Sequence, residues 1–376
     1  EPYCYRDSRT DGLMQSISDS LGAEWIYQKT GIQFIFFNTA YQLHAARNTP
    51  AMKSATTFLM LPDLLNYALS GVQSNDITNA SSTQLLNAHS QEWDWDLIEK
   101  LEIPRSIFPA LHKPGIKIGN IKGHGNLDGI SVVAVGSHDT ASAVAGVPLN
   151  PDRSSAYISS GTWSLVGLEL DSPVTDAKAL SYNITNEVGV ADRIRFIKNV
   201  SGMWLLEESL RYWKSMGLEL SAAQLAHDAH SLPPQQIIDT NEPRFAKPGA
   251  MPERIAEYCR ETNQTVPSTP AEFARCIFDS LAAAYARSLA ELEDAAQVKI
   301  SEIDIVGGGA SNDLLNQLTA DATGLTVIAG PVEATVMGNL IIQMMSAGWI
   351  ASLEEGRSLI SKSVERKVFL PKVERG

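Results

Sequence analysis

The chain has 376 residues, of which 44% are hydrophobic and 19% are charged, as in a globular protein large enough for two hydrophobic cores. Its formal net charge is −13, so it lacks the basic excess that a nucleic acid or an anionic membrane surface attracts. We therefore expect no nucleic-acid partner and no membrane. A small anionic ligand would have to be held by local hydrogen-bond donors.

The cysteine content favours a reducing compartment. Three cysteines, Cys4, Cys259 and Cys276, are too few for a disulfide framework. Cys259 and Cys276 could pair, but reduced thiols in a cytoplasmic protein are the favoured interpretation. The most apolar long segment, residues 334–353, is interrupted by polar side chains, which favours a buried helix over a membrane span.

The first third of the chain is predicted to be mostly helical. Apolar residues at helical spacing indicate helices over residues 7–21, 38–46 and 59–69. Residues 83–100 contain four acidic side chains, which predicts a surface helix bearing Trp93 and Trp95. Residues 132–135 form a short β-branched and small apolar run, which is typical of a strand buried on both faces.

Beyond a turn-forming stretch at residues 149–153, strands and helices alternate. Residues 156–170 and 183–199 are each expected to form a pair of strands. A long helix is predicted from Thr269, which is followed by a first-turn proline and a capping glutamate. A strand at residues 303–306, three glycines and a helix over 312–323 complete the pattern. This alternation predicts an α/β fold.

The segment SVVAVGSHDTASAVAGV places an ionisable pair, His138 and Asp139, between a predicted strand and a predicted helix. In open α/β sheets, ligands bind beyond the carboxyl ends of the strands, where the following helices begin. A carboxylate held there could accept a proton from a substrate hydroxyl. The alternative is that Asp139 only caps the helix while His138 packs at the surface, and the residue types alone favour this alternative.

Three further motifs are weak when taken alone. The glycines of residues 305–312 would let the backbone approach a nucleotide, or they could only form a tight turn. The turn at residues 159–162 could bind phosphate or merely join two strands. Asn199 could hold a polyol hydroxyl or cap the helix predicted over residues 202–213.

Taken in order, the motifs resemble the FGGY family of carbohydrate kinases. The resemblance spans essentially the whole chain, and it rests on YRDSRT at 5–10, LPDLLNYALSG at 61–71, NASSTQL at 79–85, WD at 93–94, SHDTASA at 137–143, SSGTWSL at 159–165, IVGGG at 305–309 and VEATVMG at 332–338. The GTW at 161–163, together with QFIFFNT at 33–39 and FIKNV at 196–200, favours the branch that phosphorylates L-rhamnulose. Kinases of L-fuculose share the GTW and are the nearest competitor.

The resemblance implies an α/β architecture of two ribonuclease-H-like (actin-like ATPase) domains around an interdomain cleft. Residues 1–148 would be the remainder of the N-terminal domain, which binds the sugar and carries the catalytic aspartate. Residues 149–376 would be the C-terminal, nucleotide-binding domain. Family members begin with an Asp-x-Gly phosphate loop, which would precede Glu1, so we expect the first domain of this chain to be incomplete.

The resemblance also implies roles for individual residues. Asp139 would be the general base, and the sugar contacts would be His138, Asp139, Thr140 and Asn199. The ATP contacts would be Gly161, Thr162, Gly308, Gly309 and Glu207, where Glu207 occupies a position at which close relatives carry Gln. ATP and Mg²⁺ are the implied cofactors, and no metal ligand from the protein is predicted.

The expected activity is phosphorylation of a ketose, L-rhamnulose, at O1 by a cytoplasmic enzyme that is a monomer or a homodimer. Two alternatives remain open at this point. One is another FGGY sugar kinase, with an L-fuculose kinase first. The other is a catalytically silent fragment that binds sugar or nucleotide.

Overall fold

The structure is a computed structural model that describes Cys4, residues 7–150 and residues 153–372. Tyr5 and Arg6 of the first motif, and Pro151 and Asp152 of the predicted boundary, lie outside the described residues.

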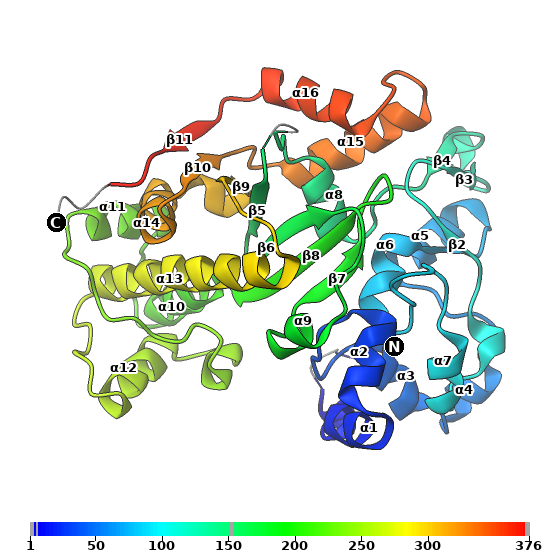
Figure 1. Cartoon of the computed structure of the whole chain (residues 1–376), viewed down its shortest axis with the longest axis horizontal. Coiled ribbons are helices and arrows are strands. Elements are labelled where there is room, and N and C mark those ends of the chain that lie inside the picture. Colours follow the sequence, from blue (N-terminus) through cyan, green and yellow to red (C-terminus); the bar gives the residue numbers. More distant parts are fainter. Residues whose placement is uncertain (1–3, 5–6, 151–152, 373–376) are drawn as a thin grey trace. The chain divides into compact units, whose positions relative to one another are not determined.

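The chain divides into two compact units, each built from three chain segments (Figure 1). The first unit holds 1–146, 169–197 and 335–357, and the second holds 147–168, 198–334 and 358–376. The predicted boundary between residues 148 and 149, and the predicted cleft, remain predictions.

The first unit is mainly helical. Its helices are α1 (Leu13–Leu21), α2 (Ala23–Thr30), α3 (Thr39–Ala46), α4 (Pro50–Ser54), α5 (Leu61–Ser70), α6 (Ile77–Ala80), α7 (Trp95–Lys100), α8 (Asp139–Ala145), α9 (Ala177–Ser181) and most of α15 (Ala334–Ser346), while α16 (Leu353–Ser363) runs on into the second unit. Its short strands are β1 (Asn75–Asp76), β2 (Leu111–His112), β3 (Lys117–Asn120), β4 (Ser131–Val133) and β7 (Thr185–Val188). α5 ends at Gly71, which adopts the left-handed conformation that is typical of a glycine at a helix C-terminus.

The prediction of a surface helix over residues 83–100 is wrong. The only α-helix there is α7, and Trp93 is 5% exposed, with its ring tilted by 59° relative to that of Phe108 and the ring centroids 4.8 Å apart. The acidic pattern misled the prediction because Asp94 is not a solvated side chain. Its carboxylate caps α7 by accepting from the Leu97 N–H at 3.0 Å, and Lys29 lies 3.3 Å from it.

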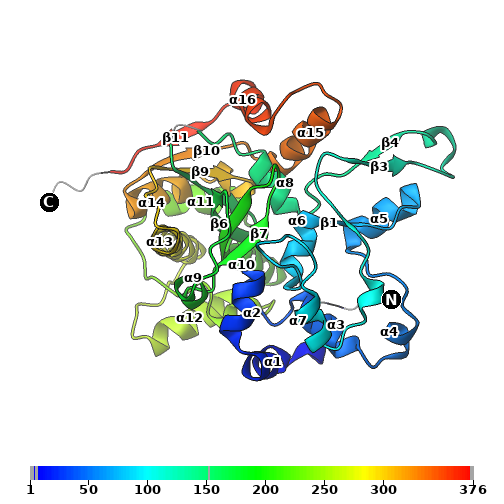
Figure 2. The ribbon, with the colours of Figure 1, turned by 45° about the vertical axis from the view of Figure 1, so that its right-hand side comes forward.

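The strand predicted at residues 132–135 is also different in the structure. β4 is Ser131–Val133, and among the described strands it pairs with β3 alone, as an antiparallel hairpin that packs against α5 (Figure 2). Val132 is buried, whereas Ser131 is exposed. The strand is therefore covered on one face and not on both, and residues 134–138 connect it to α8.

The large sheet has seven strands in the order β11-β10-β9-β5-β6-β8-β7. Its strands beyond β7 are β5 (Ser155–Ser160), β6 (Trp163–Leu170), β8 (Ile194–Ser201), β9 (Glu302–Val306), β10 (Thr326–Ala329) and β11 (Lys367–Phe369). β9 runs parallel to both β5 and β10, while β5 pairs with β6, β7 with β8 and β10 with β11 in antiparallel fashion. The predicted strand pairs at residues 156–170 and 183–199 are confirmed.

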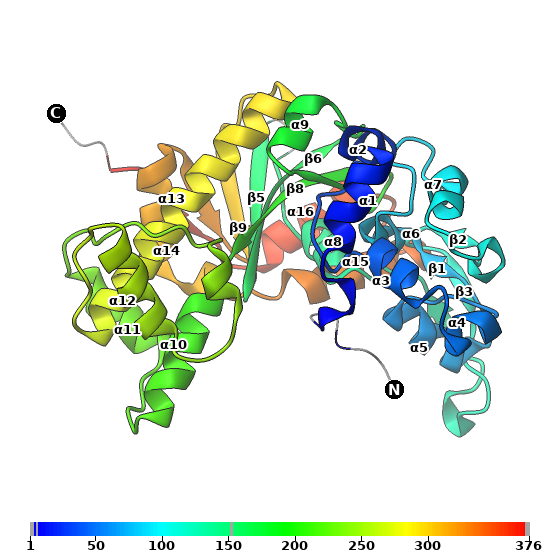
Figure 3. The same ribbon diagram turned by 90° about the horizontal axis from the view of Figure 1, so that it is seen from below.

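The second unit adds helices to its strands. They are α10 (Trp204–Ser215), α11 (Ala222–His230), α12 (Met251–Glu261), α13 (Pro270–Ala296) and α14 (Asp313–Thr323), with α11 and α14 packed on α13 (Figure 3). The long helix predicted from Thr269 is confirmed together with its capping box, in which Thr269 and Glu272 bond to each other's backbone N–H. No helix within the described residues has the length and apolarity that a membrane crossing needs.

Helix α8, which begins with Asp139, is fixed by close contact with α15. A Cβ added at Gly338 of α15 would lie 2.7 Å from the carbonyl carbon of Ser142 and 2.9 Å from the Gly146 nitrogen. Glycine is therefore required at this crossing, since any side chain would push the two helices apart.

We predict that Gly338→Ala destabilises the protein by about 1–3 kcal/mol, because overpacking outweighs the helix-propensity gain of about 1 kcal/mol that alanine brings. Urea unfolding monitored by circular dichroism measures the change. Val336→Ala, at a side chain on the same helix that is 62% exposed, is the control and should change stability by about 0.5 kcal/mol or less. Equal effects of both substitutions would contradict the close-contact argument.

Candidate active site

Asp139 is the first residue of α8, and its side chain is 86% exposed. Its Oδ1 accepts from the Thr140 N–H at 2.7 Å and lies 3.3 Å from the Thr140 hydroxyl. The N-cap position belongs to His138 and not to Asp139, and His138 makes no side-chain cap bond. Asp139 is thus an exposed carboxylate at a helix N-terminus, where the helix dipole favours negative charge.

The turn that leads into α8 is held by a buried carboxylate, Asp76, at the end of β1. Its Oδ2 accepts from the Ser137 N–H at 2.9 Å, from the Ser137 hydroxyl at 2.8 Å and from the Thr78 hydroxyl. Burial raises the pKa of Asp76, while these three hydrogen bonds oppose the shift. The short strand β1 therefore fixes the backbone just before His138.

The His138 ring lies among three charged groups of the same unit. Its Nδ1 is 3.7 Å from Asp139 Oδ1 and its Nε2 is 3.7 Å from Glu187 Oε2, while the Arg195 guanidinium lies 3.5 Å from Nδ1. Burial lowers the pKa of His138, which favours the neutral ring, and Glu187 acts in the opposite direction.

In the second unit, the turn between β5 and β6 is tied to the start of α10. The Thr162 carbonyl accepts from the Gly202 N–H at 3.1 Å and the Trp204 N–H at 3.2 Å, and the Gly161 carbonyl accepts from the Met203 N–H at 2.9 Å. A Cβ at Gly202 would lie 2.6 Å from the Gly161 oxygen. The hairpin tip and the first turn of α10 therefore form one backbone assembly.

The glycine loop after β9 packs against the same hairpin. A Cβ at Gly307 would lie 2.7 Å from the Ser160 oxygen, and one at Gly309 would lie 2.5 Å from the Ser160 Cβ. Gly308, in contrast, is exposed and has no atom within 4 Å of such a Cβ. Two of the three glycines thus allow contact with the hairpin, and Gly308 leaves open space into which a ligand could fit.

Buried hydroxyl groups connect the β5–β6 hairpin to helix α13. Within the buried layer, the Ser164 hydroxyl lies 2.6 Å from the Tyr285 hydroxyl of α13 and 3.5 Å from the Ser160 hydroxyl. Burial raises the pKa of Tyr285, so the phenol stays protonated and can donate a hydrogen bond. The long helix α13 therefore anchors the hairpin through its Tyr285.

The exposed Thr162 hydroxyl donates to Glu207 of α10, with both carboxylate oxygens at 3.3 Å. Asn199 is half-buried in β8, three residues before Gly202. The structure thus joins Gly161, Thr162 and Glu207 directly. Their predicted roles with ATP or sugar remain predictions.

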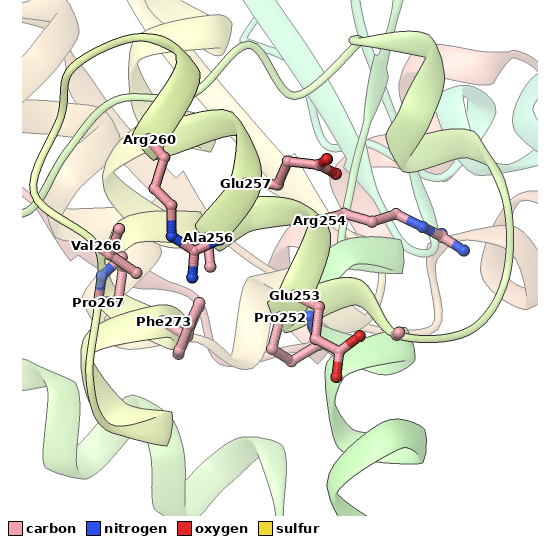
Figure 4. A pocket seen from close by; sticks show the side chains of 10 residues that line it. Pro252, Glu253, Arg254, Ala256, Glu257, Arg260, Val266, Pro267 and Phe273 are labelled. Atoms are coloured by element: carbon pink, nitrogen blue, oxygen red, sulfur yellow. The ribbon is translucent and has the colours of Figure 1, made fainter.

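A surface cavity of about 690 Å³ lies in the second unit between α12 and the start of α13 (Figure 4). Its lining includes Glu253, Arg254, Arg260 and Phe273. None of the residues that the sequence singled out contributes to it, so we do not assign it to the reaction.

Sequence reasoning missed the residues that hold the motifs in place. Asp76, Glu187 and Arg195 are buried charged side chains far from His138 in the sequence, and nothing local marks them. Arg195 is the most informative omission, because an arginine within the otherwise apolar start of β8 signals a buried partner.

Comparison with known proteins identifies the family. The sequence models of the N-terminal and C-terminal domains of the FGGY family of carbohydrate kinases match residues 3–146 and 156–347. The chain belongs to this family. No group of three or more His, Cys, Asp or Glu side chains that could hold a metal ion occurs in the described part of the chain.

Curated relatives and solved structures agree with this assignment. The chain is 43% identical to a rhamnulokinase of Oceanobacillus iheyensis over 96% of its own length and 77% of the relative's, and 42% identical to one of Bacillus subtilis over 99% and 77%. Its fold matches a xylulose kinase of Lactobacillus acidophilus with a TM-score of 0.75 at 16% identity, covering 98% of this chain and 74% of that one. A glycerol kinase of Plasmodium falciparum gives a TM-score of 0.76, with the same identity and coverage. The predicted two-domain, actin-like kinase fold is therefore confirmed.

The glycine loop yields a matched pair of substitutions. We expect Gly309→Ala to lower the free energy of unfolding by about 1–3 kcal/mol, because its methyl group would collide with Ser160. Gly308→Ala, one residue earlier and in open space, should change stability by about 0.5 kcal/mol or less. Thermal or urea unfolding distinguishes the two, and equal effects would contradict the packing described here.

Asp76 gives a pH-dependent prediction. Its folded-state pKa lies above the ordinary value of 3.8, so the native state binds more protons than the unfolded state between these two values. The free energy of unfolding therefore falls as pH rises through that window, by about 1.4 kcal/mol for each unit by which the pKa of Asp76 is raised.

Urea unfolding of the wild type and of Asp76→Asn between pH 4 and 7 tests this behaviour. The stability of the wild type relative to the variant should fall as pH rises. Asp228→Asn, at an exposed position on α11, is the matched control. Parallel curves for the wild type and Asp76→Asn would refute the predicted shift.

Proposed function

We propose that this chain transfers the γ-phosphoryl group of ATP to O1 of L-rhamnulose. The observation that carries the proposal is the identity of 41–44% to rhamnulokinases of several bacteria over nearly the whole chain. The chain spans about three quarters of the length of these relatives. A cytoplasmic location is part of the same proposal.

Asp139 is the proposed general base. It is an exposed carboxylate with an oxygen free to face a hydroxyl, since only Thr140 donates to it among the hydrogen bonds at this turn. Removing the proton as the hydroxyl attacks makes the oxygen a better nucleophile. His138, Thr140 and Asn199 are the proposed sugar contacts.

Gly161, Thr162, Gly308 and Gly309 are the proposed nucleotide contacts. The open space beside Gly308 and the exposed Thr162 hydroxyl suit a phosphate-bearing ligand that the backbone must approach closely. Glu207 accepts from Thr162 and orients that hydroxyl. Mg²⁺, bound to the phosphates, would neutralise the charge that develops during transfer.

The position of Glu207 constrains this proposal. A carboxylate beside a phosphate site repels the ligand unless a cation or a proton lies between them. Because Glu207 accepts from Thr162, we expect it to influence the affinity for Mg·ATP.

We predict that Asp139→Asn lowers kcat by about 10²- to 10⁴-fold with L-rhamnulose, because general-base catalysis is worth that much. The measurement is a coupled assay of ADP release with Mg·ATP. Asp228→Asn, an exposed aspartate on α11, is the matched control and should keep wild-type turnover.

The sugar panel in this assay holds L-rhamnulose, L-fuculose, D-xylulose and glycerol. Turnover with L-rhamnulose above all others supports the proposal. Preference for L-fuculose would keep the reaction and change the substrate. A folded protein whose melting temperature rises with sugar, but which releases no ADP, would mark a binding module without catalysis.

A further inference from the structure

The first unit contains a buried ion pair that the catalytic proposal does not use. Arg195 of β8 is fully buried, and Glu187 of β7 is 5% exposed. Arg195 Nη2 lies 3.0 Å from Glu187 Oε2. Taking two charges out of water is costly, and such pairs often add little to stability, so a buried pair beside a ligand-binding motif invites another explanation.

The ion pair lies on both sides of the His138 ring. Arg195 Nη1 is 3.5 Å from His138 Nδ1, and Glu187 Oε2 is 3.7 Å from His138 Nε2. A guanidinium can only donate hydrogen bonds, so Nδ1 presents its lone pair if it bonds to Arg195 at 3.5 Å, and this contact is shorter than the 3.7 Å that separates Nδ1 from the competing acceptor, Asp139 Oδ1. A neutral ring then carries its proton on Nε2, which faces the Glu187 carboxylate.

We propose that the Glu187–Arg195 ion pair is a positioning element that fixes the orientation and the tautomer of His138 for sugar binding. The role in sugar binding rests on the proposed function, whereas the tautomer is inferred from the geometry around His138 alone. Glu187 Oε2 is paired with Arg195 at 3.0 Å but forms no hydrogen bond of regular geometry, so it can still accept from His138 Nε2, which lies 3.7 Å away.

The pair is itself held rigidly. The Val188 carbonyl accepts from Arg195 Nε at 3.3 Å and from Nη2 at 3.2 Å, and the Thr78 carbonyl accepts from Nη2 at 3.4 Å. The Thr78 hydroxyl in turn accepts from the His138 N–H at 3.4 Å. Backbone and side chain of His138 are therefore fixed to the same two segments, which limits the positions that the ring can occupy.

Four charged groups face His138, and they act in different directions on its pKa. Glu187, Asp139 and Asp76 raise it, whereas Arg195 lowers it in the same direction as burial. Removing either partner of the ion pair must therefore shift the titration of His138, and the two shifts must have opposite signs. An ion pair at these distances shifts the titration whatever its role, so the tautomer and the sugar KM are the readouts that distinguish positioning from a structural role.

The variants are Glu187→Gln and Arg195→Gln in the full chain. Glu187→Gln leaves Arg195 uncompensated beside Nδ1, so His138 should titrate at lower pH than in the wild type. Arg195→Gln leaves Glu187 uncompensated beside Nε2, so His138 should titrate at higher pH. The double variant should lie between the two.

Nuclear magnetic resonance of protein labelled with ¹³C and ¹⁵N at histidine gives both readouts. The Cε1–H signal reports the titration, and the two ¹⁵N shifts report the tautomer. His138→Gln assigns the signal, because the chain has 7 histidines. We expect the Nε2–H tautomer in the wild type, and a wild-type ring with its proton on Nδ1 would overturn the proposal.

Kinetics test the link to the sugar. With L-rhamnulose, both variants should raise the KM for the sugar by about 10- to 100-fold, as expected when a contact is misplaced. The KM for ATP should change by about twofold or less, since the nucleotide contacts are left intact. Arg195→Lys, which keeps the charge but loses the planar fork, should give an intermediate sugar KM.

Asp279→Asn is the matched control. It breaks another buried ion pair, in which Asp279 and Arg275 of α13 lie 3.0 Å apart and each side chain is 8% exposed. It should lower thermal stability without changing the His138 titration or the sugar KM. If the two test variants shift the titration in the same direction, or leave the sugar KM unchanged, the proposal is wrong.

Failure of the proposed function would look different. A wild-type protein without turnover on L-rhamnulose would refute the substrate, while the tautomer and the opposite titration shifts would still decide the role of the ion pair. Should Arg195→Gln fail to fold, Glu187→Gln still reports the downward titration shift, and Arg195→Lys, which keeps the charge, still reports the tautomer and the sugar KM.

Discussion

The backbone contacts at the tip of the β5–β6 hairpin are so close that only hydrogen atoms fit between the segments. Gly202 approaches the Gly161 carbonyl, and Gly307 and Gly309 approach Ser160. These contacts gather the end of β8, the start of α10 and the loop after β9 around one turn. The proposed nucleotide contacts of the second unit depend on this constraint, because they come from separate parts of the sequence.

In the first unit, buried polar groups hold the proposed catalytic turn in place. The turn before α8 carries no glycine contact of this kind with another strand, and it is fixed by hydrogen bonds to Asp76 and Thr78. Hydrogen bonds to a buried carboxylate are directional and costly to leave unmade, so they specify one backbone path. Packing of α15 against α8 at Gly338 then fixes the helix that follows.

Local signals in the sequence were enough for the elements that have them. The capping box at Thr269, the stop at Gly71 and the three glycines after β9 each specify local geometry, and the order of the motifs pointed to the family. The helix predicted over residues 83–100 failed because acidic residues look alike whether they are solvated or, like Asp94, act as buried caps. Partners distant in sequence, such as Glu187 and Arg195 around His138, cannot be paired by any local rule.

Three carboxylates close to His138 show how environment separates their roles. Asp139 is exposed at a helix start, Asp76 is buried under three donors, and Glu187 is buried against a guanidinium.

Without the opposing charge of Arg195, the carboxylate of Glu187 would raise the pKa of His138 further. Arg195 acts in the same direction as burial and thereby favours the neutral ring beside the proposed base. The ion pair therefore acts on this site through His138, from residues that are distant from it in the sequence.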